Sequence, residues 1–283
     1  MLDDVLEFLT CPYCGAALSR AGAALRCPEG HAFDIARQGY ASLLPRGASG
    51  DGGDTAAMVA ARADFLAAGH FAGLAAAVAQ AGSPAGPGCV VDCGAGTGYY
   101  LARLLDALPG RAGIALERSR YALRRAARAH PRAGAVACDV WRGLPVVTGA
   151  AAVAINVFAP RNGAELRRIL RPDGRLLVVT PNPDHLRELT GALGLLTVDE
   201  RKDERLSREF GPHFSLAARQ EYRTVLELDH QGVLAAARMG PGAWHAEAAG
   251  LAERARELPE QMPVTLSVRL SVLRPGPASS VVN

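Results

Sequence analysis

The fold is decided by the stretch Val90-Val91-Asp92-Cys93-Gly94-Ala95-Gly96-Thr97-Gly98-Tyr99-Tyr100. Its apolar beginning predicts a buried parallel strand, and the apolar positions of residues 101–108 repeat at helical spacing. Three alternate glycines between them predict a tight turn. Because glycine has no Cβ and adopts positive φ at little cost, the backbone of this turn can approach a ligand closely. A nucleotide is the usual ligand of such a strand, turn and helix.

The spacing of the glycines separates two classes of nucleotide site. The dinucleotide fingerprint G-x-G-x-x-G requires glycine at position 99, where this chain has tyrosine, and the sequence instead reads G-x-G-x-G. With an aspartate at the strand end, it resembles motif I of the class I S-adenosylmethionine-dependent methyltransferases. The resemblance implies an α/β, Rossmann-like domain with S-adenosylmethionine as cofactor. The cofactor-binding candidates in this stretch are Asp92, Gly94, Gly96, Gly98 and Tyr99.

Two further acidic residues follow predicted strands. A second strand at residues 112–116 leads into Glu117, where a doubly wound sheet places the carboxylate that accepts hydrogen bonds from both ribose hydroxyls. A third strand at residues 135–140 includes Asp139, where many methyltransferases place an adenine contact. The alternative interpretation is a structural glycine turn beside a surface glutamate.

The N-terminal segment contains the pattern C-x2-C-x12-C-x3-H, formed by Cys11, Cys14, Cys27 and His31. Three thiolates and an imidazole at this spacing are typical of a tetrahedral structural zinc site. The segment has too few apolar residues for an independent core, so metal binding is expected to supply much of its folding free energy. A redox C-x-x-C pair is the alternative, but that motif belongs at the start of a helix in a βαβ unit.

Length and composition describe a globular protein with a sizeable core. The chain has 283 residues, of which 49% are hydrophobic and 21% charged. No apolar run approaches the roughly 18 residues of a membrane span, and no basic region followed by an apolar one begins the chain, so we predict a cytoplasmic protein. The net charge of +3 is too small to indicate nucleic acid by itself. Because Lys202 is the only lysine among 31 basic residues, arginine abundance is discounted as a phosphate-binding signal.

Several segments together resemble the 23S rRNA guanine-N1 methyltransferases of the RlmA family. These are the cysteine knuckle, residues 33–45 (FDIARQGYASLLP), Gly53-Asp54, residues 58–71 and motif I. Within the family, the chain resembles the type II branch, which includes the tylosin-resistance methyltransferase. This implies methylation of guanine N1 in a 23S rRNA hairpin loop near the macrolide site, and hence antibiotic resistance. A small-molecule methyltransferase, acting on a quinone or a secondary metabolite, is the alternative, but it gives no reason for a zinc module.

The family resemblance also implies roles for individual residues. The family's cofactor pocket has an aromatic residue at the position of Phe71 and a histidine at that of His185, after the fifth strand. Asn156, at the end of a fourth strand at residues 151–157, and Asp184 are candidates for contacts with the base edge. No histidine or carboxylate is spaced so as to identify a general base. On the helix predicted at residues 121–130, a face with three arginines is a candidate for phosphate contacts, although solvation is the simpler interpretation.

The predicted domain organisation has four parts. Residues 1–45 form a zinc-binding module that recognises RNA, and residues 46–54, rich in Gly, Ser and Asp, form a linker. Residues 55–274 form the methyltransferase domain, and residues 275–283 a disordered tail. The expected partner is 23S rRNA, with no membrane, and a homodimer is compatible with the sequence.

Overall fold

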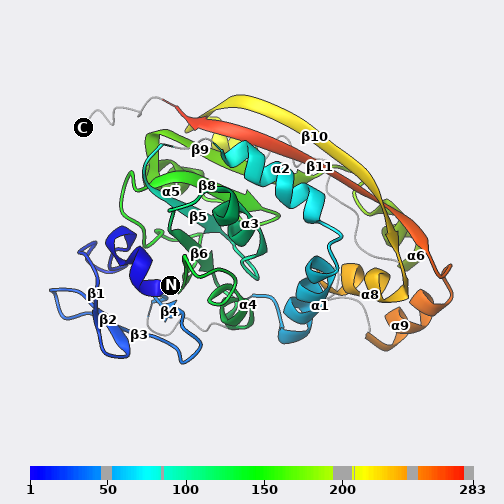
Figure 1. Cartoon of the computed structure of the whole chain (residues 1–283), viewed down its shortest axis with the longest axis horizontal. Helices are drawn as coiled ribbons and strands as arrows, with labels where there is room; N and C mark the ends of the chain where they lie inside the picture. The colour runs from blue at the N-terminus through cyan, green and yellow to red at the C-terminus, as the bar shows by residue number, and fades with distance from the viewer. Residues whose placement is uncertain (46–52, 84–85, 194–205, 207, 241–247, 277–283) are drawn as a thin grey trace.

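The computed structural model describes residues 1–45, 53–83, 86–193, 206, 208–240 and 248–276 (Figure 1). Its centre is an eight-stranded sheet with the strand order β10-β11-β9-β8-β5-β6-β7-β4. Neighbouring strands from β4 to β9 are parallel, whereas β11 is antiparallel to both β9 and β10. The strands are β4 (Ala41–Ser42), β5 (Cys89–Cys93), β6 (Gly113–Glu117), β7 (Ala133–Ala137), β8 (Ala151–Val157), β9 (Leu170–Pro181), β10 (Phe214–Leu228) and β11 (Met262–Pro275).

The chain order reverses beside β5, which lies between β6 and β8. From β5 the chain continues to β6 and β7 on one side and then returns to β8 and β9 on the other. In sheets of this kind, ligands bind outside the carboxyl ends of the strands at this reversal point. The order confirms the predicted Rossmann-like α/β fold and places the glycine turn that follows β5 at the ligand-binding position.

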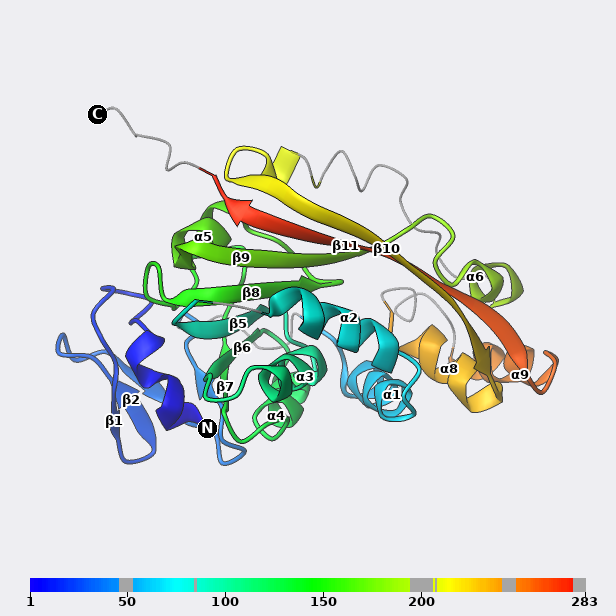
Figure 2. The same cartoon turned by 45° about the horizontal axis from the view of Figure 1, so that its top comes forward.

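Helices cover both faces of the sheet (Figure 2). Side chains alternate along each strand, so that Val90 joins one core and Val91 the other. The first core includes residues of α2, α3 and α4, and the second includes residues of α5 and of the N-terminal segment. The helices are α1 (Ala56–Ala67), α2 (Ala72–Gly82), α3 (Tyr99–Ala107), α4 (Arg120–Ala126), α5 (Gly163–Ile169), α6 (Arg187–Leu193), α8 (His230–Arg238) and α9 (Ala248–Arg256).

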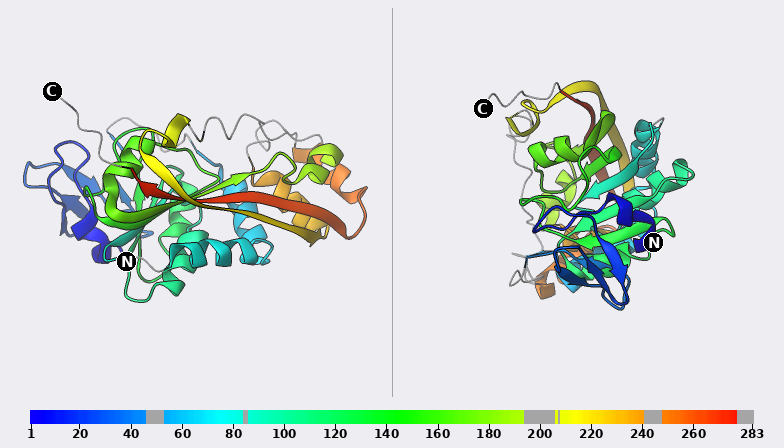
Figure 3. Two further views of the ribbon diagram at one scale, coloured as in Figure 1. Left: turned by 90° about the horizontal axis from the view of Figure 1, so that it is seen from above. Right: turned by 90° about the vertical axis from the view of Figure 1, so that its left-hand side faces the viewer.

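The N-terminal module packs directly against the sheet. It consists of the 3-10 helix η1 (Leu2–Phe8) and the antiparallel strands β1 (Ser19–Ala21), β2 (Ala24–Arg26) and β3 (Ala32–Asp34). Figure 3 shows this module at one end of the molecule and α6, α8 and α9 at the other. The module's buried apolar side chains belong to the second core of the sheet. The module is therefore anchored through apolar packing shared with the sheet, in addition to the metal binding that the sequence predicts.

Two close contacts fix this anchoring. A Cβ on Gly134, in β7, would lie 2.3 Å from Val5 Cγ2 of η1, so only glycine lets the 3-10 helix approach the strand this closely. At the edge of the sheet, β4 extends β7 through the pairs Ala41–Val136 and Ser42–Ala137. Residues 41 and 42 are thus part of the eight-stranded sheet.

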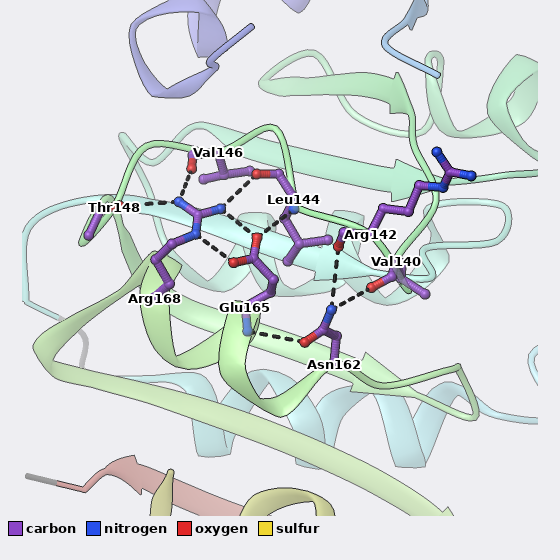
Figure 4. Close-up of polar contacts among 8 residues, drawn as sticks. All are labelled: Val140, Arg142, Leu144, Val146, Thr148, Asn162, Glu165 and Arg168. Atoms are coloured by element: carbon purple, nitrogen blue, oxygen red, sulfur yellow. Dashed lines mark hydrogen bonds and ion pairs between the residues drawn. The ribbon is translucent and has the colours of Figure 1, made fainter. Parts of the chain in front are cut away.

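The segment between β7 and β8 is tied to α5 by three side chains (Figure 4). Asn162 caps α5 and also donates to the carbonyls of Val140 and Arg142. Glu165 accepts a hydrogen bond of 2.6 Å from the Leu144 amide and pairs with Arg168 at 2.7 Å. Arg168 in turn donates to the carbonyls of Leu144 and Val146.

The same segment receives the N-terminal module. The Thr10 amide donates to the Pro145 carbonyl at 3.1 Å, and the Val147 amide donates to the Phe8 carbonyl at 2.9 Å. The stretch of chain just before Cys11, where the first cysteine knuckle begins, therefore pairs with the segment that α5 holds in place.

Some predicted elements differ in detail from the structure. The turn-forming sequence of residues 171–174, RPDG, lies inside β9. There the pairing with β8 jumps from Leu170–Ala151 to Arg175–Val153, so these residues bulge from the ladder. The third strand ends at Ala137 because Asp139 turns the chain by accepting from the Trp141 amide. Pro275, assigned to the tail, still pairs with Phe214, and residues 277–283 lie outside the described residues, as does the linker at 46–52.

Among the described residues, no single helix is long and apolar enough to cross a membrane. Helices α1 and α2 together would pass that test of length and composition, but they are bent by 83° at the break between them. Both helices contribute buried residues to the core beside the sheet.

Candidate active site and metal centre

The four predicted zinc ligands meet at one point of the N-terminal module. Their ligand atoms all lie within 4.8 Å of one another. The Sγ atoms of Cys14 and Cys27 are 3.7 Å apart, and His31 Nδ1 lies 3.5 Å from Cys11 Sγ and 3.3 Å from Cys27 Sγ. Zn–S distances of about 2.3 Å and a Zn–N distance of about 2.0 Å give tetrahedron edges of about 3.8 Å between sulfurs and about 3.5 Å between sulfur and nitrogen. The donor set therefore fits a structural zinc ion.

Local hydrogen bonds form the two knuckles. The Gly15 amide donates to the Cys11 carbonyl at 2.9 Å, and the Gly30 amide donates to the Cys27 carbonyl at 3.1 Å. Both glycines have positive φ, which lets the chain turn directly after Cys14 and again between Cys27 and His31. The C-x-x-C pair thus lies in a turn and not at the start of a helix, so its setting is that of a metal knuckle and not of a redox motif.

The three glycines of the nucleotide turn have different neighbours although all have positive φ. A Cβ on Gly94 would lie 2.4 Å from Ala159 Cβ, and one on Gly98 would lie 2.8 Å from Ala129 Cβ. These two glycines permit close packing within the protein. A Cβ on Gly96 would meet only the end of Arg62, with Nη1 at 3.5 Å. Gly96 is thus the member of the three at which a Cβ would make only ordinary van der Waals contact, with a flexible side chain, so a ligand can approach the backbone there.

Glu117 lies across from this turn at the end of β6. Its Oε2 accepts from the Gly96 amide at 2.8 Å, and its Oε1 accepts from the amides of Arg118 and Ser119 at 2.7 and 2.8 Å. Among the described residues, it forms no ion pair. A carboxylate has about four acceptor sites, so about one site remains after these three bonds. The carboxylate thus holds the glycine turn in place and can still accept from a ribose hydroxyl.

Asp92 is buried at the end of β5, directly before the glycine turn. Burial raises the pKa of its carboxyl to about 8, and the negative charge of Glu117 contributes to the increase. Nearby, the hydroxyls of Tyr99 and Tyr100 are buried and have no hydrogen-bond partner among the described residues. Buried polar groups of this kind are usually paired. Unpaired hydroxyls beside an open glycine turn fit a site that is completed by a polar ligand.

A row of aromatic rings runs from the core to the surface beside this turn. Phe71 packs edge-on against Phe65 with ring centroids 5.0 Å apart, and both rings are buried. The His185 ring lies 6.4 Å from Phe71 and stacks against Phe158 at 5.7 Å with an interplanar angle of 24°. The structure thus brings Phe71 and His185 together, although one precedes β5 and the other follows β9.

The other predicted site residues already have partners within the chain. Asn156 is fully buried, and its Nδ2 donates to the carbonyls of Cys93 and Pro160, which favours a positioning role over the predicted contact with the base. Asp184 pairs with Arg223 of β10, so its carboxylate is already engaged within the chain. The Asp139 carboxylate accepts from Arg118 Nη1 at 3.2 Å, so a contact with adenine would share it with this guanidinium.

Two residues beside the site were given no role by the sequence analysis. Arg62, on α1, pairs with Asp54 and donates to the Met239 carbonyl at 2.6 Å, which holds its guanidinium over Gly96. A guanidinium there can pair with a ligand carboxylate. Phe158 exposes an aromatic ring next to the end of β8. Arg62 lies in an alanine-rich helix whose local pattern assigns it no role. Phe158 could have been found, because an aromatic residue directly after a strand that ends at the ligand site is a usable signal.

These features fit S-adenosylmethionine. The loosely packed Gly96 lets a ligand approach the backbone. The remaining acceptor capacity of Glu117, the unpaired tyrosine hydroxyls and the Arg62 guanidinium offer partners for a ribose, an amino group and a carboxylate. When bound, this cofactor supplies a methyl group that its positively charged sulfur has already activated.

Known proteins resemble this chain along nearly its whole length. A zinc-ribbon family model described as "RlmA, N-terminal" matches residues 9–47. The 23S rRNA (guanine(748)-N(1))-methyltransferase of Streptomyces fradiae is 50% identical over 281 residues, which covers 98% of this chain and 100% of that protein. A protein of Micromonospora griseorubida, named provisionally for the same reaction on guanine N1, is 52% identical over 97% of this chain and 100% of its own length. The chain belongs to the family of 23S rRNA (guanine-N1)-methyltransferases and is a methyltransferase of RlmA type.

Proposed function

We propose that this enzyme transfers the methyl group of S-adenosylmethionine to N1 of a guanine in 23S rRNA. The observation that carries the proposal is the 50% identity, over the full length of both chains, with an enzyme whose name specifies N1 of guanine 748. We further propose that the target is the corresponding guanine, in a hairpin loop near the macrolide site, and that this chain belongs to the type II branch.

The enzyme mainly has to position the acceptor base, because the methyl group of the cofactor is already activated. Guanine N1 lies on the Watson–Crick edge and carries a proton, so the base must be unpaired or flipped out, and the proton must leave before or during the attack. The acceptor nitrogen must then be held in line with the methyl group at about 3 Å. In this proposal, Gly96 and Glu117 orient the cofactor, while the loop after β8 positions the base and excludes water.

The N-terminal module is assigned to RNA recognition. It docks on residues 145–147, before β8, whereas the proposed base site follows the end of β8. A strand of seven residues spans about 20 Å, so the module would contact RNA away from the target base. On the side of the cofactor site, the exposed side chains of Arg124, Arg125 and Arg128 are suited to phosphate contacts.

Resistance to tylosin-type macrolides is the expected consequence. A methyl group on N1 adds bulk and blocks the Watson–Crick edge, and a steric clash with a drug packed on that base would cost about 1–3 kcal/mol. We expect that expression in a sensitive host without its own such enzyme raises the inhibitory concentration of tylosin, alone or together with a second ribosomal modification. The same cells should show a new reverse-transcription stop one nucleotide 3′ of a single guanine.

Expression of the Gly96→Val variant at the same level is the control, and it should produce neither effect. Cells that carry the wild-type enzyme but show no new stop would contradict the proposed target. A stop without any change in tylosin susceptibility, with or without the second modification, would contradict only the link to resistance.

A further inference from the structure

Phe158 exposes a large aromatic ring in a strained backbone conformation. Its side chain is 41% exposed and its φ is 54°, a region that bulky residues rarely adopt. Within the described parts of the chain, Leu186 is the only other non-glycine residue with positive φ, and it directly follows His185, on which Phe158 stacks. Such strain costs about 1–3 kcal/mol and is concentrated at functional sites. One strained residue thus belongs to the aromatic pair of Phe158 and His185, and the other directly follows it in sequence.

The loop that carries Phe158 is held from several sides. Asn156 Nδ2 donates to the carbonyls of Cys93 and Pro160 at 3.0 and 2.8 Å, which ties the loop to the end of β5. The Phe158 amide donates to the Val179 carbonyl of β9 at 3.2 Å. Because Gly94 has no Cβ, Ala159 can pack against the glycine turn. The surrounding structure therefore enforces the exposed ring, which would otherwise relax its backbone and bury itself.

Phe158 lies at the edge of the sheet where the acceptor base is expected to bind. Phe158 directly follows β8, beside the point where the strand order reverses, and its loop contacts the glycine turn through Ala159 and Gly94. His185 and the buried ring of Phe71 lie behind it, at centroid distances of 5.7 and 6.3 Å. The exposed aromatic ring of Phe158 thus lies next to the expected place of the methyl group.

We propose that Phe158, backed by His185, is the surface on which the target guanine stacks. Unpaired bases are commonly recognised by stacking on aromatic side chains, which fixes the plane of the base. Stacking leaves the Watson–Crick edge uncovered, so N1 can turn toward the methyl group. Asn156 acts on this surface as a positioning residue, because it holds the loop at Pro160. The inference rests on the proposed function and specifies how the enzyme holds its base.

The test compares Phe158→Leu with Phe158→Tyr in the full-length protein. Methyl transfer to protein-free 23S rRNA gives kcat and KM, and calorimetry gives the affinity for S-adenosylhomocysteine. Leucine keeps an apolar side chain but cannot stack, so kcat/KM should fall about 5- to 150-fold, which corresponds to the loss of one base–aromatic stack. Tyrosine should keep kcat/KM within about 3-fold of wild type, and both variants should keep the cofactor affinity within about 2-fold. Leu216→Ala, at an exposed apolar residue of β10, is the control and should behave as wild type.

The outcomes separate this inference from the proposed function. If the wild-type enzyme does not methylate guanine N1 of 23S rRNA, the proposed function fails. If the wild type is active and Phe158→Leu is equally active, the stacking surface is refuted while the function stands. If Phe158→Leu weakens S-adenosylhomocysteine binding as much as it lowers kcat/KM, Phe158 belongs to the cofactor pocket and the inference is also wrong.

Discussion

Valine at position 96 is expected to lower the affinity for S-adenosylhomocysteine roughly 100-fold, near the upper end of the 1–3 kcal/mol that overpacking costs. Gly96 is the glycine of the nucleotide turn that is not packed tightly against the protein, so a branched side chain there fills the volume that the ligand needs. The chain should remain folded, because a Cβ at this position meets only the flexible end of Arg62. Calorimetric titration measures the affinity, and thermal unfolding checks the fold.

The matched control is Gly110→Val. Gly110 also has positive φ, at 78°, and a Cβ there would meet nothing within 4 Å, so this variant introduces similar backbone strain away from the cofactor. It should bind S-adenosylhomocysteine within about 3-fold of wild type. Wild-type affinity in Gly96→Val would show that the cofactor binds elsewhere.

In parallel, Glu117→Gln should weaken binding of S-adenosylhomocysteine by about 1–3 kcal/mol through the loss of charge-assisted hydrogen bonds.

Removal of one zinc ligand is expected to destabilise the whole protein. Cys11→Ser should reduce the zinc content from one ion per chain to nearly none, and structural zinc sites contribute on the order of 10 kcal/mol to the folding of isolated modules. The loss of stability should extend beyond the N-terminal module, because the buried side chains of the module share a core with the sheet. Metal analysis gives the stoichiometry, and thermal unfolding should show a lower Tm for the methyltransferase domain as well.

Cys89→Ser provides the control for the same chemical change at a buried position. The Cys89 thiol lies 3.6 Å from the Ala150 carbonyl, so a serine hydroxyl there has an acceptor at hand. Its zinc content should equal that of the wild type, and its Tm should change much less than that of Cys11→Ser. A wild-type protein that contains no zinc in reducing buffer, or that keeps its Tm after strong chelation, would contradict the metal centre.

Local chemistry made much of the fold predictable. The fourth strand was expected at residues 151–157, where β8 lies, because a continuous apolar run is typical of a strand buried on both faces. Threonine is a preferred N-cap residue, and the side chain of Thr55 caps α1 by accepting from the Met58 amide at 3.2 Å. The zinc ligands were identifiable because all four lie in one short segment of the sequence, at a spacing that is typical of a structural zinc site.

Contacts between distant segments were not predictable in this way. The packing of Val5 against Gly134 joins residues far apart in sequence, and nothing local distinguishes Gly134 from any other glycine in a strand. The positive φ of Phe158 opposes the local preference of a bulky residue and is imposed by Asn156 and the neighbouring strands. The ion pair between Asp184 and Arg223 was not predictable either, because Arg223 lies far away in sequence, in β10.

The most direct measurement is transfer of a tritium-labelled methyl group from S-adenosylmethionine to protein-free 23S rRNA by the purified enzyme, followed by digestion and nucleoside analysis. The wild-type enzyme should place the label in N1-methylguanosine, at about one methyl group per rRNA, and Gly96→Val should place none there. Label in N2-methylguanosine or in a ribose-methylated nucleoside, or no transfer to rRNA while S-adenosylhomocysteine binds normally, would contradict the assignment of this enzyme to guanine N1.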